Sequence, residues 1–150
     1  MKNYLLILIL LLTGNLIAQN VKKEDLRLVT EKSIYFKNNA AKIKVRLWNK
    51  SKDTLNYLCM SCSWQEFYKM SNKNITIRIN ECDKNIPQIL ILKPGESRTV
   101  EIYVLRSNGT KDDFKLGMSI IQTKELKIPS ADYILTEAKV IWSSSIYPKN

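Results

Sequence analysis

The chain has 150 residues, no histidine and three cysteines, and its 24 basic residues exceed its 14 acidic residues to give a net charge of +10. The missing histidine excludes Ser-His-Asp and Cys-His catalysis and the histidine-ligated zinc hydrolases. Lysine supplies 19 of the basic residues and arginine only 5. Because arginine is the usual bidentate ligand of phosphate, this charge predicts weak polyanion binding and no specific nucleic-acid binding.

The first eighteen residues have the layout of a cleavable signal peptide. Lys2 is followed by an apolar run over residues 5–12, a Thr-Gly break and the small residue Ala18. The run is shorter than a bilayer-spanning helix requires, and no later run approaches that length. We therefore expect residues 1–18 to be removed on export, with an uncleaved N-terminal anchor as the alternative. Residues 19–150 would then form a single domain, periplasmic or secreted, without a membrane span.

The rest of the chain repeats the two-residue period of β-strands. Residues 41–49 alternate apolar and polar side chains, and further extended runs occupy 54–62, 74–80, 98–104, 114–120 and 134–142. Residues 87–92 are apolar on both faces, as in a central strand buried on both sides. Turn residues such as Pro94-Gly95 separate the runs. The pattern predicts an all-β, antiparallel immunoglobulin-like β-sandwich of about seven to eight strands, with one short helical turn near 64–70.

Two segments carry a resemblance to known scaffolds. "KVRLWNKSKDTLNYL" (44–58) is a strand that runs into an Asn-rich turn, and "LKPGESRTVEIYV" (92–104) is a Lys-Pro-Gly-Glu turn followed by an alternating strand. This arrangement resembles bacterial exported immunoglobulin-like modules and is similar to the scaffold of the bacterial intracellular proteinase-inhibitor domain. The resemblance implies a binding scaffold and assigns no functional residue.

The three cysteines allow three interpretations. A redox Cys-x-x-Cys site needs a helix after its first thiol, and no helix signal follows Cys59. A soft-metal carrier, for example of copper, could use the cysteines and Met60. A structural disulfide is favoured because Cys62 lies at a strand end, on the face opposite Cys59, from which the chain can turn toward Cys82. We therefore predict Cys62–Cys82 over Cys59–Cys82, with Cys59 as a spare thiol.

Aromatic side chains are the candidate partner-binding residues. Trp48 ends the basic outer face of the strand at 41–49, where it anchors a partner or covers a strand edge. Trp64, Phe67 and Tyr68 lie close together in the following segment. They either cap the end of the sandwich or form a recognition loop, because binding residues concentrate on loops of rigid scaffolds.

The function is predicted mainly by excluding catalytic sites. The acidic pairs Glu24-Asp25 and Asp112-Asp113 lie in loop-like segments and do not suggest a glycosidase. We expect a non-catalytic exported module that binds a protein partner in the cell envelope, without a metal or other cofactor. An inhibitor or immunity-type protein acting on an exported enzyme is the alternative, and a soft-metal carrier is the third possibility. The oligomeric state is left open.

Overall fold

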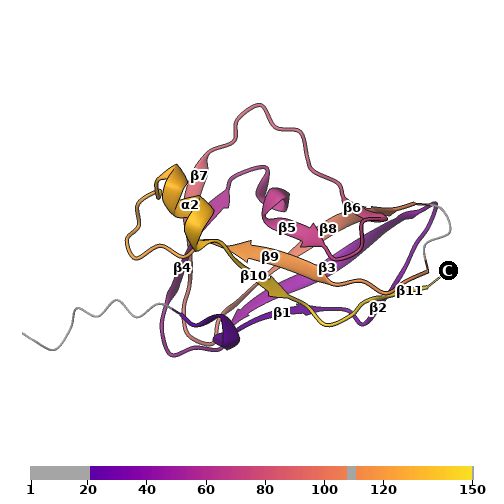
Figure 1. Ribbon diagram of the computed structural model, residues 1–150, viewed down its shortest axis with the longest axis horizontal. Coiled ribbons are helices and arrows are strands. Elements are labelled where there is room, and N and C mark those ends of the chain that lie inside the picture. Colours follow the sequence, from indigo (N-terminus) through magenta and orange to yellow (C-terminus); the bar gives the residue numbers. More distant parts are fainter. Residues whose placement is uncertain (1–20, 108–110, 150) are drawn as a thin grey trace, which may run out of the picture.

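The protein is an antiparallel immunoglobulin-like β-sandwich (Figure 1). The computed structural model describes residues 21–107 and 111–149, so the predicted signal peptide at 1–18 lies outside the described residues. In chain order the elements are η1 (Lys23–Asp25), β1 (Leu26–Thr30), β2 (Ser33–Tyr35), β3 (Ala40–Asn49), β4 (Leu55–Met60), η2 (Trp64–Phe67), β5 (Tyr68–Met70), β6 (Ile75–Ile77), β7 (Pro87–Leu92), β8 (Ser97–Arg106), β9 (Leu116–Ile120), α2 (Ala131–Glu137), β10 (Lys139–Trp142) and β11 (Tyr147–Lys149). None of the described helices is long and apolar enough to cross a membrane.

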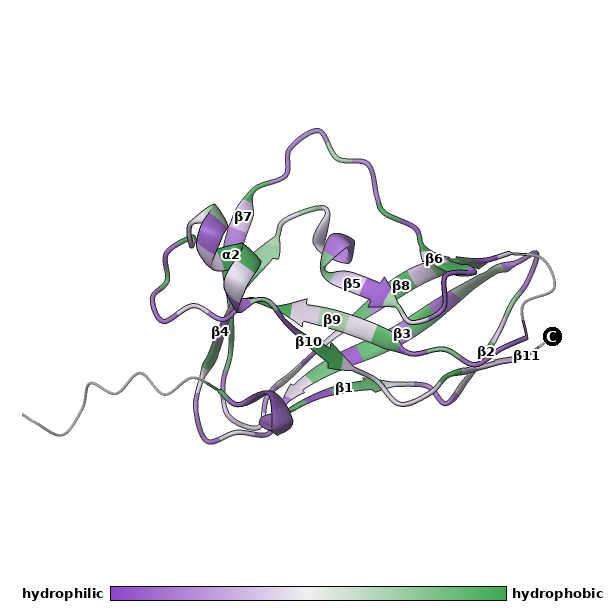
Figure 2. Cartoon of the chain, in the orientation of Figure 1, coloured by the Kyte–Doolittle hydropathy of each residue, from purple (hydrophilic) through white to green (hydrophobic). Residues whose placement is uncertain are grey.

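One layer of the sandwich is a four-stranded sheet in the order β1-β3-β8-β6. Its centre is the long antiparallel pair β3/β8, in which Ile43 lies opposite Ile102 and Val45 lies opposite Val100. Buried and exposed residues alternate along β3, which confirms the strand predicted at 41–49. Figure 2 shows the same alternation of hydrophobic and hydrophilic residues along both strands. One face of the pair therefore supplies the core and the other faces solvent.

The other layer is assembled around β9. Strand β10 pairs with one edge of β9 and β5 pairs with the other. Strand β4 pairs with β7 and reaches β9 through a bridge between Tyr57 and Gln122 and a hydrogen bond from the Leu58 N–H to the Ile121 carbonyl. Strands β4 and β5 thus follow each other along the same edge of β9, and the chain between them bulges out as η2.

The hydrophobic core lies between the two layers and is drawn from both ends of the chain. The fully buried side chains include Ile43, Leu55, Tyr57, Ile102, Phe114, Leu116, Ile120 and Ile146. The short strands β2 and β11 close the sandwich as a parallel pair, with Ser33 opposite Tyr147. The described residues form more strands than the seven to eight expected, because short pairs such as this one carry too little alternation to be seen in the sequence.

The apolar run at 87–92 is not the central strand that its composition suggested. It forms β7, which pairs with β4 on one side, and among the described residues no strand pairs with its other side. The side chain of Ile91 is 52% exposed. The prediction of a strand buried on both faces was therefore wrong, because an apolar run marks either a central strand or an edge strand that leaves apolar surface uncovered.

The strand predicted at 134–142 is only half formed. Residues Ala131–Glu137 form helix α2, and the strand β10 is limited to Lys139–Trp142. The helix begins after Pro129, where the Ser130 hydroxyl accepts a hydrogen bond from the Tyr133 N–H. This N-cap was the available sequence signal, and seven residues are too few for a helical period to stand out.

Asn49 links the two turns that join the layers. Its side chain is fully buried, and its amide nitrogen donates hydrogen bonds to the carbonyls of Asp53 and Leu92 at 2.8 and 2.9 Å. Its amide oxygen accepts from the backbone N–H and the hydroxyl of Ser51. Its backbone carbonyl accepts from the N–H of Gly95. The turns at 50–54 and 93–96, distant in sequence, are thereby held by one residue.

Candidate functional site

A cleft of about 330 Å³ lies between the layers, at the end of the sandwich where β4 and β7 face β8. The wall on the β8 side includes Arg98 and Val100. The wall on the opposite layer includes Gln88 and Leu90 of β7. Apolar and aromatic side chains line most of the cleft, as in sites that bind apolar groups.

Aromatic residues form the third wall of the cleft. Trp64, Phe67 and Tyr68 all line it, so the structure brings together three of the four aromatic residues proposed from the sequence. The rings of Trp64 and Tyr68 meet edge to face, with centroids 5.9 Å apart and planes at 84°. Both residues also pack against the hydrophobic core. The helical turn expected near 64–70 is η2, which carries Trp64 and Phe67, and Tyr68 begins β5. The rings are therefore part of the sandwich rather than of a free loop.

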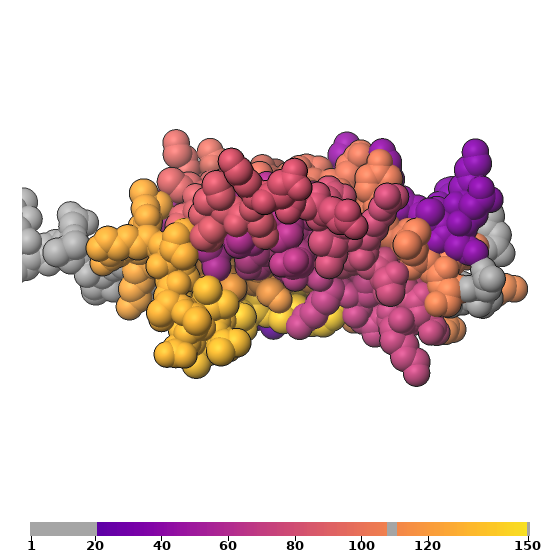
Figure 3. All heavy atoms as spheres, turned by 90° about the horizontal axis from the view of Figure 1, so that it is seen from above, coloured from indigo at the N-terminus to yellow at the C-terminus, as the bar shows by residue number. Residues whose placement is uncertain are grey.

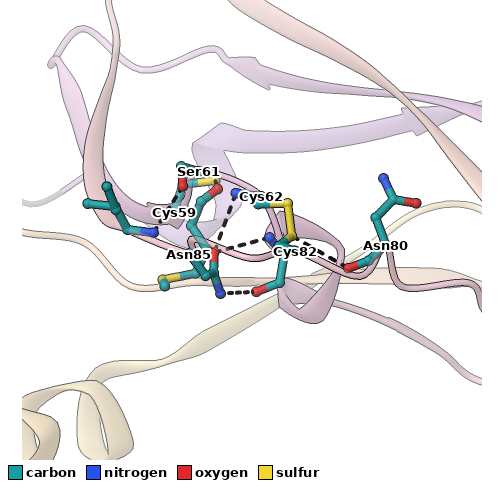
Figure 4. Close-up of a disulfide and its surroundings, with 9 residues drawn as sticks. Cys59, Ser61, Cys62, Asn80, Cys82 and Asn85 are labelled. Atoms are coloured by element: carbon teal, nitrogen blue, oxygen red, sulfur yellow. Dashed lines mark hydrogen bonds between the residues drawn. A yellow bond between two sulfur atoms is a disulfide. The ribbon is translucent and has the colours of Figure 1, made fainter.

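A disulfide holds the aromatic wall to the β6–β7 connection. Cys62 and Cys82 are bonded, with Cα atoms 6.1 Å apart, which confirms the predicted pairing (Figure 4). Beside the bond, the side-chain oxygen of Asn85 accepts hydrogen bonds from the backbone N–H groups of Cys62 and Ser63. Figure 3 shows the connection lying across the middle of this face of the molecule. The bond is therefore a staple that fixes the segment leading into η2.

Cys59 is the remaining free cysteine, and it lies half-buried in the lining of the cleft. Burial raises the pKa of its thiol, and the nearby Arg98 guanidinium partly opposes this shift. The group is therefore a neutral thiol near pH 7. The redox interpretation needs Cys62 as its second thiol, and that sulfur is bonded to Cys82. The same bond removes two thiolates from the soft-metal set, and the described residues contain no group of three Cys, Asp or Glu side chains able to hold a metal ion.

The raised pKa of Cys59 predicts slow alkylation. With the disulfide intact, iodoacetamide should modify Cys59 more slowly in the folded protein than in urea at pH 8, and the rate should rise at higher pH because the thiolate is the nucleophile. Arg98→Gln should slow the reaction further, since the guanidinium lowers this pKa. Mass spectrometry of the alkylated peptide measures both rates. A folded rate at pH 7 that exceeds the rate in urea contradicts the assignment of a neutral thiol.

Trp48 does not belong to the cleft. Its indole N–H donates to the carbonyl of Gly95 at 3.1 Å, and the Lys50 ammonium lies 4.8 Å from its ring centroid. It is half-buried on the outer face of β3, next to the turn before β8. Trp48 therefore covers the turn at 93–96. It does not cover a strand edge as considered from the sequence, because β3 is paired at this position with both Arg27 of β1 and Ser97 of β8.

Two charged residues of β8, Arg98 and Glu101, line the cleft. Glu101 lines it, yet the Glu101 carboxylate pairs with Lys42 on the outer face of the sheet at 3.4 Å, between two exposed side chains. Glu101 therefore borders the cleft while its carboxylate is engaged outside it. Arg98 is exposed, and within the described residues it forms no salt bridge. Sequence reasoning missed Arg98, Gln88 and Leu90, because alternation assigns a residue to a face without showing which cavity that face lines.

Comparisons with known proteins found solved structures of low similarity and no family. No protein-family model and no curated protein match it. A solved structure of Escherichia coli alpha-2-macroglobulin is 13% identical with a TM-score of 0.47, over 83% of this chain and 7% of that one. An ASH/PapD-like domain of human CEP192 is 8% identical with a TM-score of 0.37, over 91% of each chain. The N-terminal domain of PorA is 10% identical with a TM-score of 0.37, over 78% of this chain and 85% of that one. The comparisons show no similarity to the proteinase-inhibitor domain.

Proposed function

We propose that this chain is an exported, non-catalytic immunoglobulin-like module that binds a protein partner in the cell envelope through the cleft. The observation that carries the proposal is the aromatic wall of Trp64, Phe67 and Tyr68, which is concave and solvent-accessible. Buried aromatic anchors supply much of the energy of protein interfaces. A stable disulfide fits a protein that works in an oxidising compartment, which supports export.

The chemistry of the cleft favours binding over catalysis. Its ionisable lining groups are a neutral thiol, two tyrosines, Arg98 and Glu101. Burial raises the pKa of Tyr57 to about 12, so its hydroxyl is not a base near neutral pH. The Glu101 carboxylate is directed toward Lys42. The described lining therefore lacks a pair of groups that could accept and return a proton at physiological pH.

The wall is also held in place before any partner arrives. The disulfide, the Asn85 hydrogen bonds and the contact between Trp64 and Tyr68 fix the segment that carries the rings. A surface that is already ordered loses little conformational entropy on binding, which favours affinity. This rigidity distinguishes the cleft from a loop that would have to fold around its partner.

Site-specific photo-crosslinking tests the proposal. A benzophenone amino acid placed at position 67, in cells that normally produce the protein, should yield a discrete protein adduct on irradiation. The same group at Tyr35, which is 68% exposed on β2 away from the cleft, is the matched control and should give no such adduct. Loss of the adduct on Trp64→Ala would tie it to the aromatic wall. Absence of an adduct at 67, or equal labelling from 35, contradicts the proposal.

The captured protein also decides between the two classes of binding module. A stoichiometric adduct with an exported hydrolase or toxin would favour an inhibitor or immunity-type role. An adduct with a structural envelope protein would favour a role in assembly.

A further inference from the structure

The outer edge of β7 carries backbone groups with no partner strand among the described residues. The Ser61 N–H donates to the Ile86 carbonyl, so these two residues form a hydrogen-bonded pair at the end of the β4/β7 ladder. Such pairs recur at every second residue in antiparallel sheets. Gln88, Leu90 and Leu92 therefore direct their backbone groups toward β4.

Ile89 and Ile91 must then direct their N–H and carbonyl groups outward. The opposite residues on β4 confirm this alternation of inward and outward backbone groups. Leu58, which lies opposite Ile89, donates its N–H away from β7, to the carbonyl of Ile121. Pro87, which has no N–H, occupies another outward position, as expected on an edge strand. The edge thus offers two backbone N–H donors and neighbouring carbonyl acceptors, spaced two residues apart as a further strand requires.

The strand with this free edge also forms part of the wall of the cleft. Gln88 and Leu90 place their side chains in the cleft lining from β7, and Glu101 lines it from β8. Within the described residues, β6 pairs with β8 only at Val104–Arg106, so the first half of β8 also has an unpaired edge. A strand added to β7 would direct every second side chain inward, between the two layers. Those side chains would meet the aromatic wall.

Charge identifies the kind of strand that fits. The chain carries a net charge of +10, which disfavours a second copy as the added strand. Arg98 is exposed at the cleft and forms no salt bridge among the described residues. The exposed side chains of Ile86 and Ile91 add apolar surface along the edge. The occupant should therefore combine apolar side chains with carboxylates.

We propose that the cleft binds an extended segment of a partner protein, rich in apolar and acidic residues, which adds to the free edge of β7 as a further strand. The inference rests on the proposed function and specifies how that function is carried out. Backbone hydrogen bonds to Ile89 and Ile91 supply register, apolar side chains enter the cleft, and a carboxylate pairs with Arg98. This division of roles is general for strand addition to a sheet edge.

A phage-displayed library of random twelve-residue peptides, selected on the folded domain, provides the probe. Selection should enrich peptides in which apolar residues alternate with other residues and at least one is acidic. Ile91→Pro should weaken binding of the synthetic winners at least tenfold, because the ring blocks the outward N–H while leaving the ladder to β4 intact. Ile91→Ala removes a similar side chain, keeps the N–H and is the matched control, with an expected change below threefold.

Two further variants complete the test. Arg98→Gln should weaken the binding of acidic peptides about fivefold, and added salt should weaken their binding to the wild-type protein. Thermal melting verifies that Ile91→Pro is folded. Strand addition is contradicted if the selected peptides bind the Ile91→Pro protein as tightly as the wild-type protein, or if the selection enriches no peptide. Neither of these results changes the interpretation of the adduct at position 67. That adduct tests the proposed function independently of strand addition.

Discussion

Replacing Asn49 by alanine is expected to lower the free energy of unfolding by about 3 to 4 kcal/mol. The fully buried side chain makes four hydrogen bonds, two donated and two accepted, and each contributes on the order of 1 kcal/mol. The turn at 50–54 and the Leu92 carbonyl at the end of β7 would lose their common side-chain partner, whereas the backbone hydrogen bond from Gly95 to residue 49 would remain. For a domain of this size the melting temperature should fall by roughly 10 °C. Urea unfolding followed by circular dichroism measures the change.

Two variants control the Asn49 experiment. Asn49→Asp keeps the acceptor for Ser51 but loses the donors to Asp53 and Leu92, so it should also be strongly destabilised. Asn80→Ala changes an exposed asparagine and should alter the free energy of unfolding by less than about 0.5 kcal/mol. An Asn49→Ala protein as stable as the Asn80→Ala protein would refute the structural role assigned to this residue.

Replacing Cys82 by serine is the second large effect we expect. The disulfide closes a loop with a sequence separation of 20, and its removal should lower the free energy of unfolding by about 3 kcal/mol through the entropy gained by the unfolded chain. The segment before η2 would also lose its covalent tie to the β6–β7 connection. Near-ultraviolet circular dichroism should therefore report weaker ordering of Trp64 even where the domain remains folded.

The control for the disulfide experiment is Cys59→Ser. Cys59 forms no disulfide and is half-buried, so its replacement should change stability by less than about 1 kcal/mol. Thiol titration of the denatured wild-type protein should give one free thiol, mapped to Cys59 by peptide alkylation. Three free thiols, or equal stability of Cys82→Ser and Cys59→Ser, would show that the staple is absent from the purified protein.

Local patterns in the sequence were enough to predict the fold class and the staple. Alternation over 41–49 and 98–104 predicted β3 and β8, because one face of each strand is buried against the opposite layer. Strand parity separated Cys59 from Cys62 and so selected the correct partner for Cys82. The strand predictions succeeded because each depends on neighbours within one strand.

The cleft could not be predicted in the same way. Arg98 and Leu90 line it from two different layers, and their proximity depends on how β7 and β8 pack. The apolar character of β7 was visible, but hydropathy alone does not distinguish a strand buried in a sheet from an edge that leaves apolar surface uncovered. Trp48 and Trp64 were both aromatic candidates, and only the packing of the layers shows that Trp48 covers a turn instead.

The parallel pair of β2 and β11 has a consequence for biosynthesis. Ser33–Tyr35 is made early, whereas its partner Tyr147–Lys149 and the buried Ile146 are made after every other described strand. A growing chain therefore cannot complete this core until residues 146–149 have left the ribosome, although β3 and β8 can already pair. Until then the unpaired edge of β2 stays accessible to holding factors such as chaperones. Folding of this domain should thus begin from its middle strands and be completed when β11 pairs with β2.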